Sequence, residues 1–117
     1  MALVEISKLT ALPLADGVTA RSVHNTGVTV AYVRLKQGAD VPEHRHTHEQ
    51  ITTVIEGELE LTVEGESTVL TAGKAMTLGS NVAHSARALT ACYVIDVFQP
   101  VREDFRKLEA SLMDSES

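Results

Sequence analysis

The chain has 117 residues, 44% hydrophobic and 22% charged, the balance of a single globular domain that buries about two-thirds of its unfolded surface. Its formal net charge of −6 and its lack of a Lys/Arg run argue against a nucleic-acid partner. Only 3% of the residues are aromatic and none is Trp, so we expect a core built mainly of Val, Leu, Ile and Ala.

The amino-terminal segment and the single cysteine bear on the cellular compartment. Residues 1–9 lack the basic start, apolar run and cleavage site of a secretory signal, and no stretch reaches the ~18 apolar residues of a membrane span. Cys92 cannot form an intrachain disulfide, and its apolar neighbours favour a buried, unreactive thiol. We therefore expect a cytoplasmic protein with no membrane partner.

Most of the chain shows the period-two alternation of β-strands. Leu59, Leu61 and Val63 alternate with Glu60 and Thr62, which predicts a strand with one buried face. Short turns rich in Gly and Asn separate such segments, as is typical of a sandwich or barrel. Strands are predicted at residues 28–35, 50–55, 59–63, 67–70, 75–78 and 91–98.

The carboxyl-terminal part has a different period. Apolar residues recur there at i, i+4, i+7 and i+11, which predicts a helix over residues 101–113, with Glu103 and Asp104 suited to its first turn. No linker or internal repeat divides the chain, so residues 1–117 form one all-β domain with a barrel at about 18–99. The helical stripe consists of Val101, Phe105, Leu108 and Leu112.

A histidine cluster dominates the middle of the chain. His44 and His46 lie two residues apart, so on a strand both imidazoles project from one face and can share a metal ion. In an unbroken strand Gln50 would lie about 20 Å from His44, at ~3.3 Å per residue, so the chain has to turn near residues 47–49 for Gln50 to return to the metal. His84 would close the site from a distant hairpin.

The polar residues of this region are also compatible with a simple surface loop. The segment HRHTHEQ, residues 44–50, could be a solvent-exposed polar loop without a metal. For His24, beside the turn at residues 25–27, a surface position is expected. His48 and Glu49 fall in the predicted turn, at the rim of the site.

One segment resembles the first motif of the cupin superfamily, G-x5-H-x-H-x(3,4)-E-x6-G. Gly38, His44, His46 and Gly57 match it, and Gln50 replaces the acidic residue by its isosteric amide. The resemblance implies a double-stranded β-helix, or jelly-roll barrel, with one divalent transition metal in its mouth. Imidazole-rich sites accept Zn, Ni, Fe, Mn or Cu.

A second segment resembles the other cupin motif, G-x5-P-x-G-x2-H-x3-N. Gly73 and His84 match, whereas Gly79, Asn81 and Ala88 replace the Pro, the second Gly and the Asn. The two motifs are separated by 15 residues, as suits a small single-domain cupin. With Gln50 in the set, the ligands are all neutral and leave the metal's double positive charge in place, which favours Lewis-acid chemistry on an anionic substrate.

A lone carboxylate interrupts the last predicted strand. Asp96 lies on the same face as Val94 and Phe98, where an isolated carboxylate would be desolvated and its pKa raised. Such a group near a metal suits general acid–base catalysis, although a solvated barrel face is the alternative. Arg102 follows a strand end and a Pro, where it could fold over the barrel mouth or point into solvent.

These features together resemble KdgF-type cupins of pectin and alginate degradation. The matching stretches are HRHTHEQ (44–50), NVAH (81–84) and IDVFQPVREDF (95–105). The resemblance implies an enzyme that opens 4,5-unsaturated monouronates into linear keto sugars. It implies metal ligands at His44, His46, Gln50 and His84, and a substrate site at Asp96, Phe98 and Arg102.

Two other functions are compatible with the sequence. One is a cupin dioxygenase or isomerase acting on another small acid, and the other is a non-catalytic cupin that binds a small ligand. Each takes a small anionic molecule, and a sugar acid fits the resemblance. Exposed apolar strand faces and the habit of the family lead us to expect a homodimer.

Overall fold

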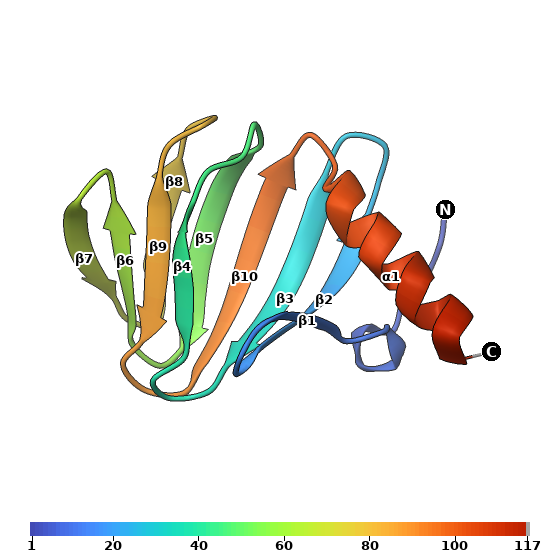
Figure 1. The fold of residues 1–117 in the computed structure, drawn as a ribbon, viewed down its shortest axis with the longest axis horizontal. Coiled ribbons are helices and arrows are strands. Elements are labelled where there is room, and N and C mark those ends of the chain that lie inside the picture. Colours follow the sequence, from blue (N-terminus) through green and yellow to red (C-terminus); the bar gives the residue numbers. More distant parts are fainter. Residues whose placement is uncertain (117) are drawn as a thin grey trace.

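The computed structural model describes residues 1–116, with side chains to Asp114, and consists of two antiparallel sheets and a helix (Figure 1). A short 3₁₀ helix, Ile6–Lys8, comes first, and helix α1, Glu103–Glu116, comes last. The strands are β1 (Leu12–Ala15), β2 (Val18–His24), β3 (Thr29–Leu35), β4 (Asp40–His44), β5 (Glu49–Glu56), β6 (Leu59–Val63), β7 (Glu66–Leu70), β8 (Ala75–Leu78), β9 (His84–Ala88) and β10 (Cys92–Gln99).

The two sheets enclose one apolar core between them. Six strands form the sheet β1-β2-β3-β10-β5-β8, and four form the sheet β4-β9-β6-β7. The predicted all-β class with a carboxyl-terminal helix is confirmed, and the six predicted strands lie within one residue of observed ones. Strands β1, β2, β4 and β9 have no counterpart in the prediction, because their apolar positions alternate less regularly.

Turns at glycine determine how neighbouring strands connect. Strands β6 and β7 pair Val63 with Glu66, which leaves Glu64-Gly65 as a two-residue hairpin loop. Both loop residues have positive φ, 49° and 81°, the geometry that matches strand twist and that glycine adopts without strain. At Gly57, between β5 and β6, φ is 91° and a Cβ atom would collide with the carbonyl oxygen of Ala91.

The core differs from the predicted composition in one respect. Leucine, valine and alanine dominate the buried positions of the described chain, as expected, but isoleucine is absent from them. Ile51 and Ile55 are exposed, and Ile95 is half-buried. These three β-branched residues lie on the outer face of the six-stranded sheet, because each falls out of phase with the inward-facing residues of its strand.

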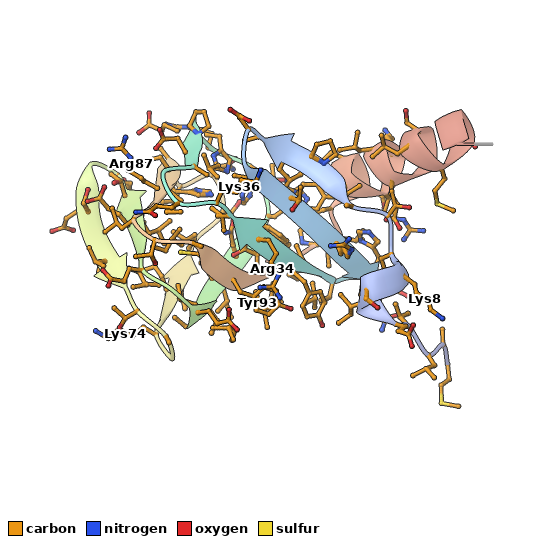
Figure 2. The ribbon with its side chains drawn as sticks, turned by 90° about the horizontal axis from the view of Figure 1, so that it is seen from below. Lys8, Arg34, Lys36, Lys74, Arg87 and Tyr93 are labelled. Carbon is orange, nitrogen blue, oxygen red and sulfur yellow. The ribbon has the colours of Figure 1, made fainter. Side chains whose placement is uncertain are left out.

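The outer face of this sheet is continuous across its central strands. Ile95 of β10 pairs with Tyr32 of β3 and with Thr53 of β5. Nearby, the guanidinium carbon of Arg34 lies 4.1 Å from the centre of the Tyr93 ring, and Figure 2 shows the two side chains next to each other. The face is thus mainly apolar and carries a cation–π pair near one end.

Helix α1 closes one side of the barrel. The chain leaves β10 through a cis Gln99–Pro100 bond, and the helix then lies beyond β2 and β3, near the amino terminus (Figure 1). Phe105 is buried, and Leu108 and Leu112 pack against the core, as the helical stripe predicts. No helix within residues 1–116 has the length and apolar character that crossing a membrane requires.

Candidate metal centre and substrate pocket

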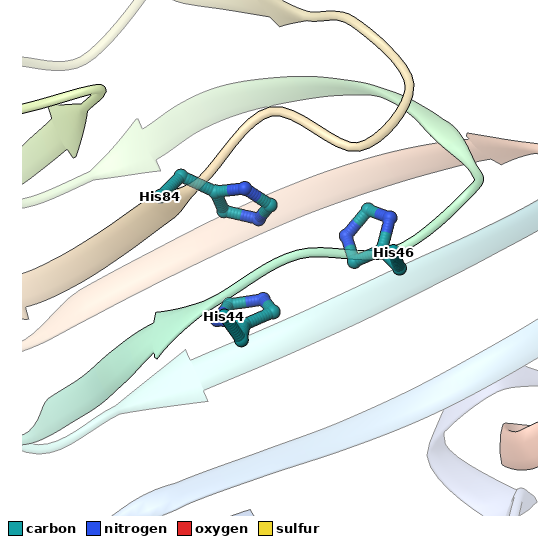
Figure 3. A group of neighbouring side chains, drawn as sticks. All are labelled: His44, His46 and His84. Atoms are coloured by element: carbon teal, nitrogen blue, oxygen red, sulfur yellow. The ribbon is translucent and has the colours of Figure 1, made fainter.

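Three histidines from separate parts of the chain meet at the mouth of the barrel (Figure 3). His44 ends β4, His46 lies in the following loop, and His84 begins β9, which pairs with β4 at His44. One potential ligand nitrogen from each ring lies within 4.8 Å of the others. His84 is buried, His46 is half-buried and His44 is exposed, so the three rings can hold an ion at the edge of the pocket.

Backbone carbonyls orient all three imidazoles. The Nδ1 atoms of His44 and His84 lie 2.8 Å from the carbonyl oxygens of Pro42 and Val82, and Nδ1 of His46 lies 3.0 Å from that of His48. Because a carbonyl only accepts, each Nδ1 carries the proton and donates it. Each Nε2 is therefore left with a free lone pair, the tautomer that binds a metal.

Two of these Nε2 atoms have surroundings that a cation would satisfy. Nε2 of His84 is buried and has no hydrogen-bond partner. Nε2 of His46 lies 3.1 Å from Oε1 of Gln50, so two lone pairs face each other. A metal ion between them would convert both unfavourable arrangements into bonds, which is why we judge that this set of residues fits a metal.

Electrostatics keep two of the rings neutral. Burial, the positive charge of Arg102 and the neighbouring His84 together lower the pKa of His46 to about 4. Burial also lowers the pKa of His84. At neutral pH these two imidazoles are unprotonated and ready to bind a cation.

Gln50 is linked to Asp96 by hydrogen bonds through Thr52. Strands β5 and β10 pair Thr52 with Asp96, and both residues face the pocket. Nε2 of Gln50 donates to Oγ1 of Thr52 over 2.8 Å, and this hydroxyl donates to Oδ1 of Asp96 over 2.7 Å. Burial raises the pKa of Asp96 to about 6, although the hydrogen bonds from Thr52 and Gln50 and the charge of Arg102 oppose the shift.

Arg102 borders the same pocket and lies between two aromatic rings. Its guanidinium carbon is 4.6 Å from the centre of the Phe98 ring and 4.0 Å from that of Phe105. Nε and Nη2 donate to the two carboxylate oxygens of Asp104 over 2.9 and 2.7 Å, which lowers the pKa of Asp104. The Arg102 side chain is only 11% exposed, so stacking and a bidentate ion pair fix its position.

A buried polar cluster of Thr29, His24 and Glu109 bonds the backbone of Arg102. The backbone N–H of Arg102 donates to Oγ1 of Thr29 over 2.9 Å, and Nδ1 of His24 lies 2.7 Å from the same hydroxyl. Nε2 of His24 lies 3.4 Å from Oε2 of Glu109 in helix α1. The expected surface position of His24 is wrong: its side chain is 12% exposed, because the helix packs over it.

Two of the three histidines, His44 and His84, border one cavity of about 590 Å³ together with Gln50 and the acidic and basic groups. Most of its wall is apolar and comes from residues of both sheets and the helix. A second hollow of about 720 Å³, near Gly17, Arg34 and Cys92, contains no histidine. The polar groups of the first cavity are His44, Gln50, Thr52, His84, Asp96, Arg102 and Asp104, with Glu43 and Ser85 at its border.

The predicted residues thus converge, and the predicted turn is present at Thr47-His48. His48 is half-buried, with its ring centre 5.3 Å from that of His46, and Glu49 is exposed. Sequence reasoning missed Thr29 and Thr52. For Thr52 a signal existed, since it lies two residues after Gln50 and therefore on the same strand face.

Residues 31–98, more than half of the chain, match the family model of the Cupin domain, and the chain therefore belongs to the cupin family. It is 32% identical over 95 residues to pectin degradation protein KdgF of Dickeya dadantii (strain 3937), covering 79% of this chain and 86% of that protein. The solved structure of KdgF from Halomonas sp. superposes with a TM-score of 0.79 at 29% identity, covering 85% of this chain and 94% of that one. Within the family, the chain is a cupin of the KdgF type.

A relative of another kind is the HTH-type transcriptional regulator PuuR of Escherichia coli (strain K12). The identity is 29% over 93 residues, which cover 74% of this chain and 50% of the regulator. The chain therefore spans about half the length of that protein.

Proposed function

We propose that this protein is a metal-dependent enzyme that opens 4,5-unsaturated monouronates into linear keto sugars in uronate catabolism. The observation that carries the proposal is a cavity lined by two histidines of the triad, a half-buried carboxyl with a raised pKa and a fixed arginine. The similarity to a pectin degradation protein supports the same class of substrate.

One divalent transition metal, of the series Zn, Ni, Fe, Mn and Cu, would be held by His44, His46 and His84, with the amide oxygen of Gln50 as a fourth ligand. When bound, it would polarise an oxygen atom of the substrate as a Lewis acid. The amide and imidazole ligands carry no charge, so they would leave the double positive charge of the metal in place. The site therefore favours an anionic substrate.

Arg102 would bind the carboxylate of the substrate. Asp104 occupies Nε and one N–H of Nη2, which leaves the remaining guanidinium N–H groups for a second carboxylate. Phe98, which is 3% exposed and stacks on Arg102, would form an apolar wall against the sugar ring and exclude water.

Asp96 would move the proton that the reaction requires. The substrate is a cyclic enol ether with a hemiacetal at C1, and the product is a linear keto aldehyde of the same composition. Asp96 would accept the C1 hydroxyl proton as the bond between C1 and the ring oxygen breaks, and would return a proton to C4 as the enol becomes a ketone. Because its pKa is raised to about 6, Asp96 is suited both to accept and to return a proton near neutral pH.

The test is elemental analysis of the purified protein, followed by incubation with unsaturated monouronates made by a polysaccharide lyase. We expect one transition metal per chain and a loss of ultraviolet absorbance as the conjugated double bond disappears. Asp96→Ala should lower turnover by about 10²- to 10⁴-fold, the usual contribution of a general acid or base, while metal remains bound. An active Asp96→Ala variant would overturn the assignment, and oxygen consumption would indicate a dioxygenase instead.

A non-catalytic ligand-binding cupin is the second candidate, favoured by the similarity to part of a transcriptional regulator. This function predicts saturable binding of a sugar acid without turnover. Calorimetric titration of the metal-loaded protein with unsaturated monouronate, followed by analysis of the recovered ligand, separates the two. Unchanged ligand after prolonged incubation favours the binding module.

We further propose that the protein is a cytoplasmic homodimer. The apolar outer face around Ile51, Ile55 and Ile95 is self-complementary in chemistry and lies on central strands of the six-stranded sheet. The buried lone thiol of Cys92 suits a reducing compartment. Light scattering should give twice the monomer mass, and Ile51→Lys should give the monomer mass with unchanged metal content.

A further inference from the structure

The hydrogen bonds between Gln50, Thr52 and Asp96 have a defined direction. Thr52 is buried, with 3% of its surface exposed, and its hydroxyl has one proton and two lone pairs. A carboxylate only accepts, so the hydroxyl proton of Thr52 goes to Asp96 over 2.7 Å. The hydroxyl is then left as an acceptor toward Gln50.

This direction determines which end of the Gln50 amide faces the metal centre. Thr52 can accept a hydrogen bond from the amide nitrogen, at 2.8 Å, but has no proton left for the amide oxygen. The oxygen therefore points the other way, where it lies 3.1 Å from Nε2 of His46. Only the oxygen has lone pairs for a metal, because the amide nitrogen shares its pair with the carbonyl group.

We propose that Thr52 is a positioning residue of the metal centre, which with Asp96 orients the Gln50 amide so that its oxygen faces the metal. The inference rests on the metal site of the proposed function, but not on the substrate or the reaction. Thr52 is not one of the proposed ligands; it acts through Gln50, whose amide nitrogen donates to its hydroxyl. Residues of this kind, which orient a ligand, typically contribute 10- to 100-fold to metal affinity.

The direction of these bonds also explains why an amide occupies position 50. A glutamate there would also be an acceptor, and the single hydroxyl proton of Thr52 could serve only one of two carboxylates. The other carboxylate would lie buried against a lone pair, at a cost in stability. Gln50 and Asp96 are therefore a matched donor and acceptor on either side of Thr52.

The first experiment measures Zn²⁺ affinity by competition with a chromogenic chelator, and records the visible spectrum of the Co²⁺-loaded protein. Thr52→Val, which keeps the shape and removes the hydroxyl, should weaken Zn²⁺ binding by about 10-fold or more and alter the Co²⁺ bands. Thr52→Ser, which keeps the hydroxyl, is the matched control and should stay within about 3-fold of the wild type. Circular dichroism of each variant shows whether it folds.

Equal affinities for wild type and Thr52→Val would overturn the proposal, and so would an equal loss in both variants. Neither measurement involves a uronate. A protein with no turnover could therefore still confirm the role of Thr52, and an active uronate enzyme could still refute it.

A charge-swap experiment gives a second test that does not need Thr52→Val to fold. Gln50→Glu alone should lower the melting temperature of the chelator-treated protein, because Thr52 then lies between two acceptors. Adding Asp96→Asn should restore it, since the new amide can donate to Thr52 while Thr52 donates to the new carboxylate. Strictly additive shifts would overturn the proposal. In a Thr52→Ala background the restoration should shrink, and undiminished restoration would mean that charge repulsion alone, not Thr52, couples the two sites.

Discussion

The histidine side of the pocket is oriented by neighbours in the sequence, whereas the arginine side combines such neighbours with residues far along the chain. His44, His46 and His84 each bond the carbonyl of a residue two positions away. The guanidinium of Arg102 also bonds a residue two positions away, Asp104. Its backbone N–H, in contrast, bonds Thr29, which is 73 positions away and links it to His24 and Glu109. Local turns therefore orient the imidazoles of the candidate metal centre, and the packing of helix α1 helps to orient the proposed substrate site.

This difference implies that the two sides can be damaged separately. A change in the helix should affect substrate binding and leave the metal in place, because no helix residue contributes to the histidine triad. A change in a histidine should remove the metal and leave the helix docked. Substitutions on each side test this separation, beginning with the largest expected effect.

The largest effect is expected from His84→Ala. Loss of a direct ligand should lower metal affinity by more than the roughly 10- to 100-fold that an orienting residue contributes, and turnover should be lost with the metal. His48→Ala is the matched control, since His48 lies beside the triad but outside it. Elemental analysis of both variants checks the prediction, and full metal content in His84→Ala would contradict it.

Arg102→Met should raise KM for an unsaturated monouronate by about 10- to 100-fold, the equivalent of one charge-assisted hydrogen-bonded contact of ~1.5–3 kcal/mol. Metal content should stay the same, because Arg102 is not part of the histidine triad. Arg106→Met, at an exposed arginine of helix α1, is the control and should leave KM unchanged. A loss of metal in Arg102→Met would mean that the two sides are not independent.

Glu109→Gln tests the helix contact at a distance from the substrate. The half-buried contact with His24 is expected to contribute ~1 kcal/mol or less, so KM should rise by only about 2- to 5-fold. Metal affinity should be unaffected. Glu103→Gln, an exposed residue at the start of the helix, provides the control, and equal kinetics in both variants would show that Glu109 does not help to position Arg102.

The last effect, similar in size to that of Glu109→Gln, concerns the pH dependence of stability in chelator-treated protein. The pKa of His46 is lowered from 6.5 to about 4, so the unfolded chain binds this proton first and stability falls as pH drops from about 6.5 toward 4. The pKa of Asp96 is raised from 3.8 to about 6, so the folded chain binds that proton first and stability rises as pH drops through about 6. The two effects oppose each other.

Between pH 7 and pH 5, the free energy of unfolding of Asp96→Asn should therefore fall by about 1 kcal/mol more than that of the wild type. The figure follows from ~1.4 kcal/mol per pKa unit. Urea unfolding at the two pH values measures this difference. Parallel profiles for the two proteins would show that the Asp96 carboxyl has an ordinary pKa.

Part of this architecture could be predicted from the sequence because it depends on local periodicity. The alternation at Leu59–Val63 fixes which side chains face inward, and the helical spacing of Phe105, Leu108 and Leu112 fixes the buried face of α1. The spacing of His44 and His46 and the need for a turn before Gln50 follow from strand dimensions alone. The all-β fold and the grouping of the histidines follow from these patterns and from the cupin motifs.

The remaining features depend on partners that the sequence does not bring together. His24 is half-buried because Glu109, 85 positions later, lies over it (109 − 24), and no local pattern carries that information. Thr52 acquires its role from the register of β5 against β10, which sets it opposite Asp96. Periodicity assigns a side chain to a face, but only the packing of strands and helix decides which side chain it meets there. The sequence determined which residues group in the candidate metal centre, and the tertiary structure determined how they are oriented.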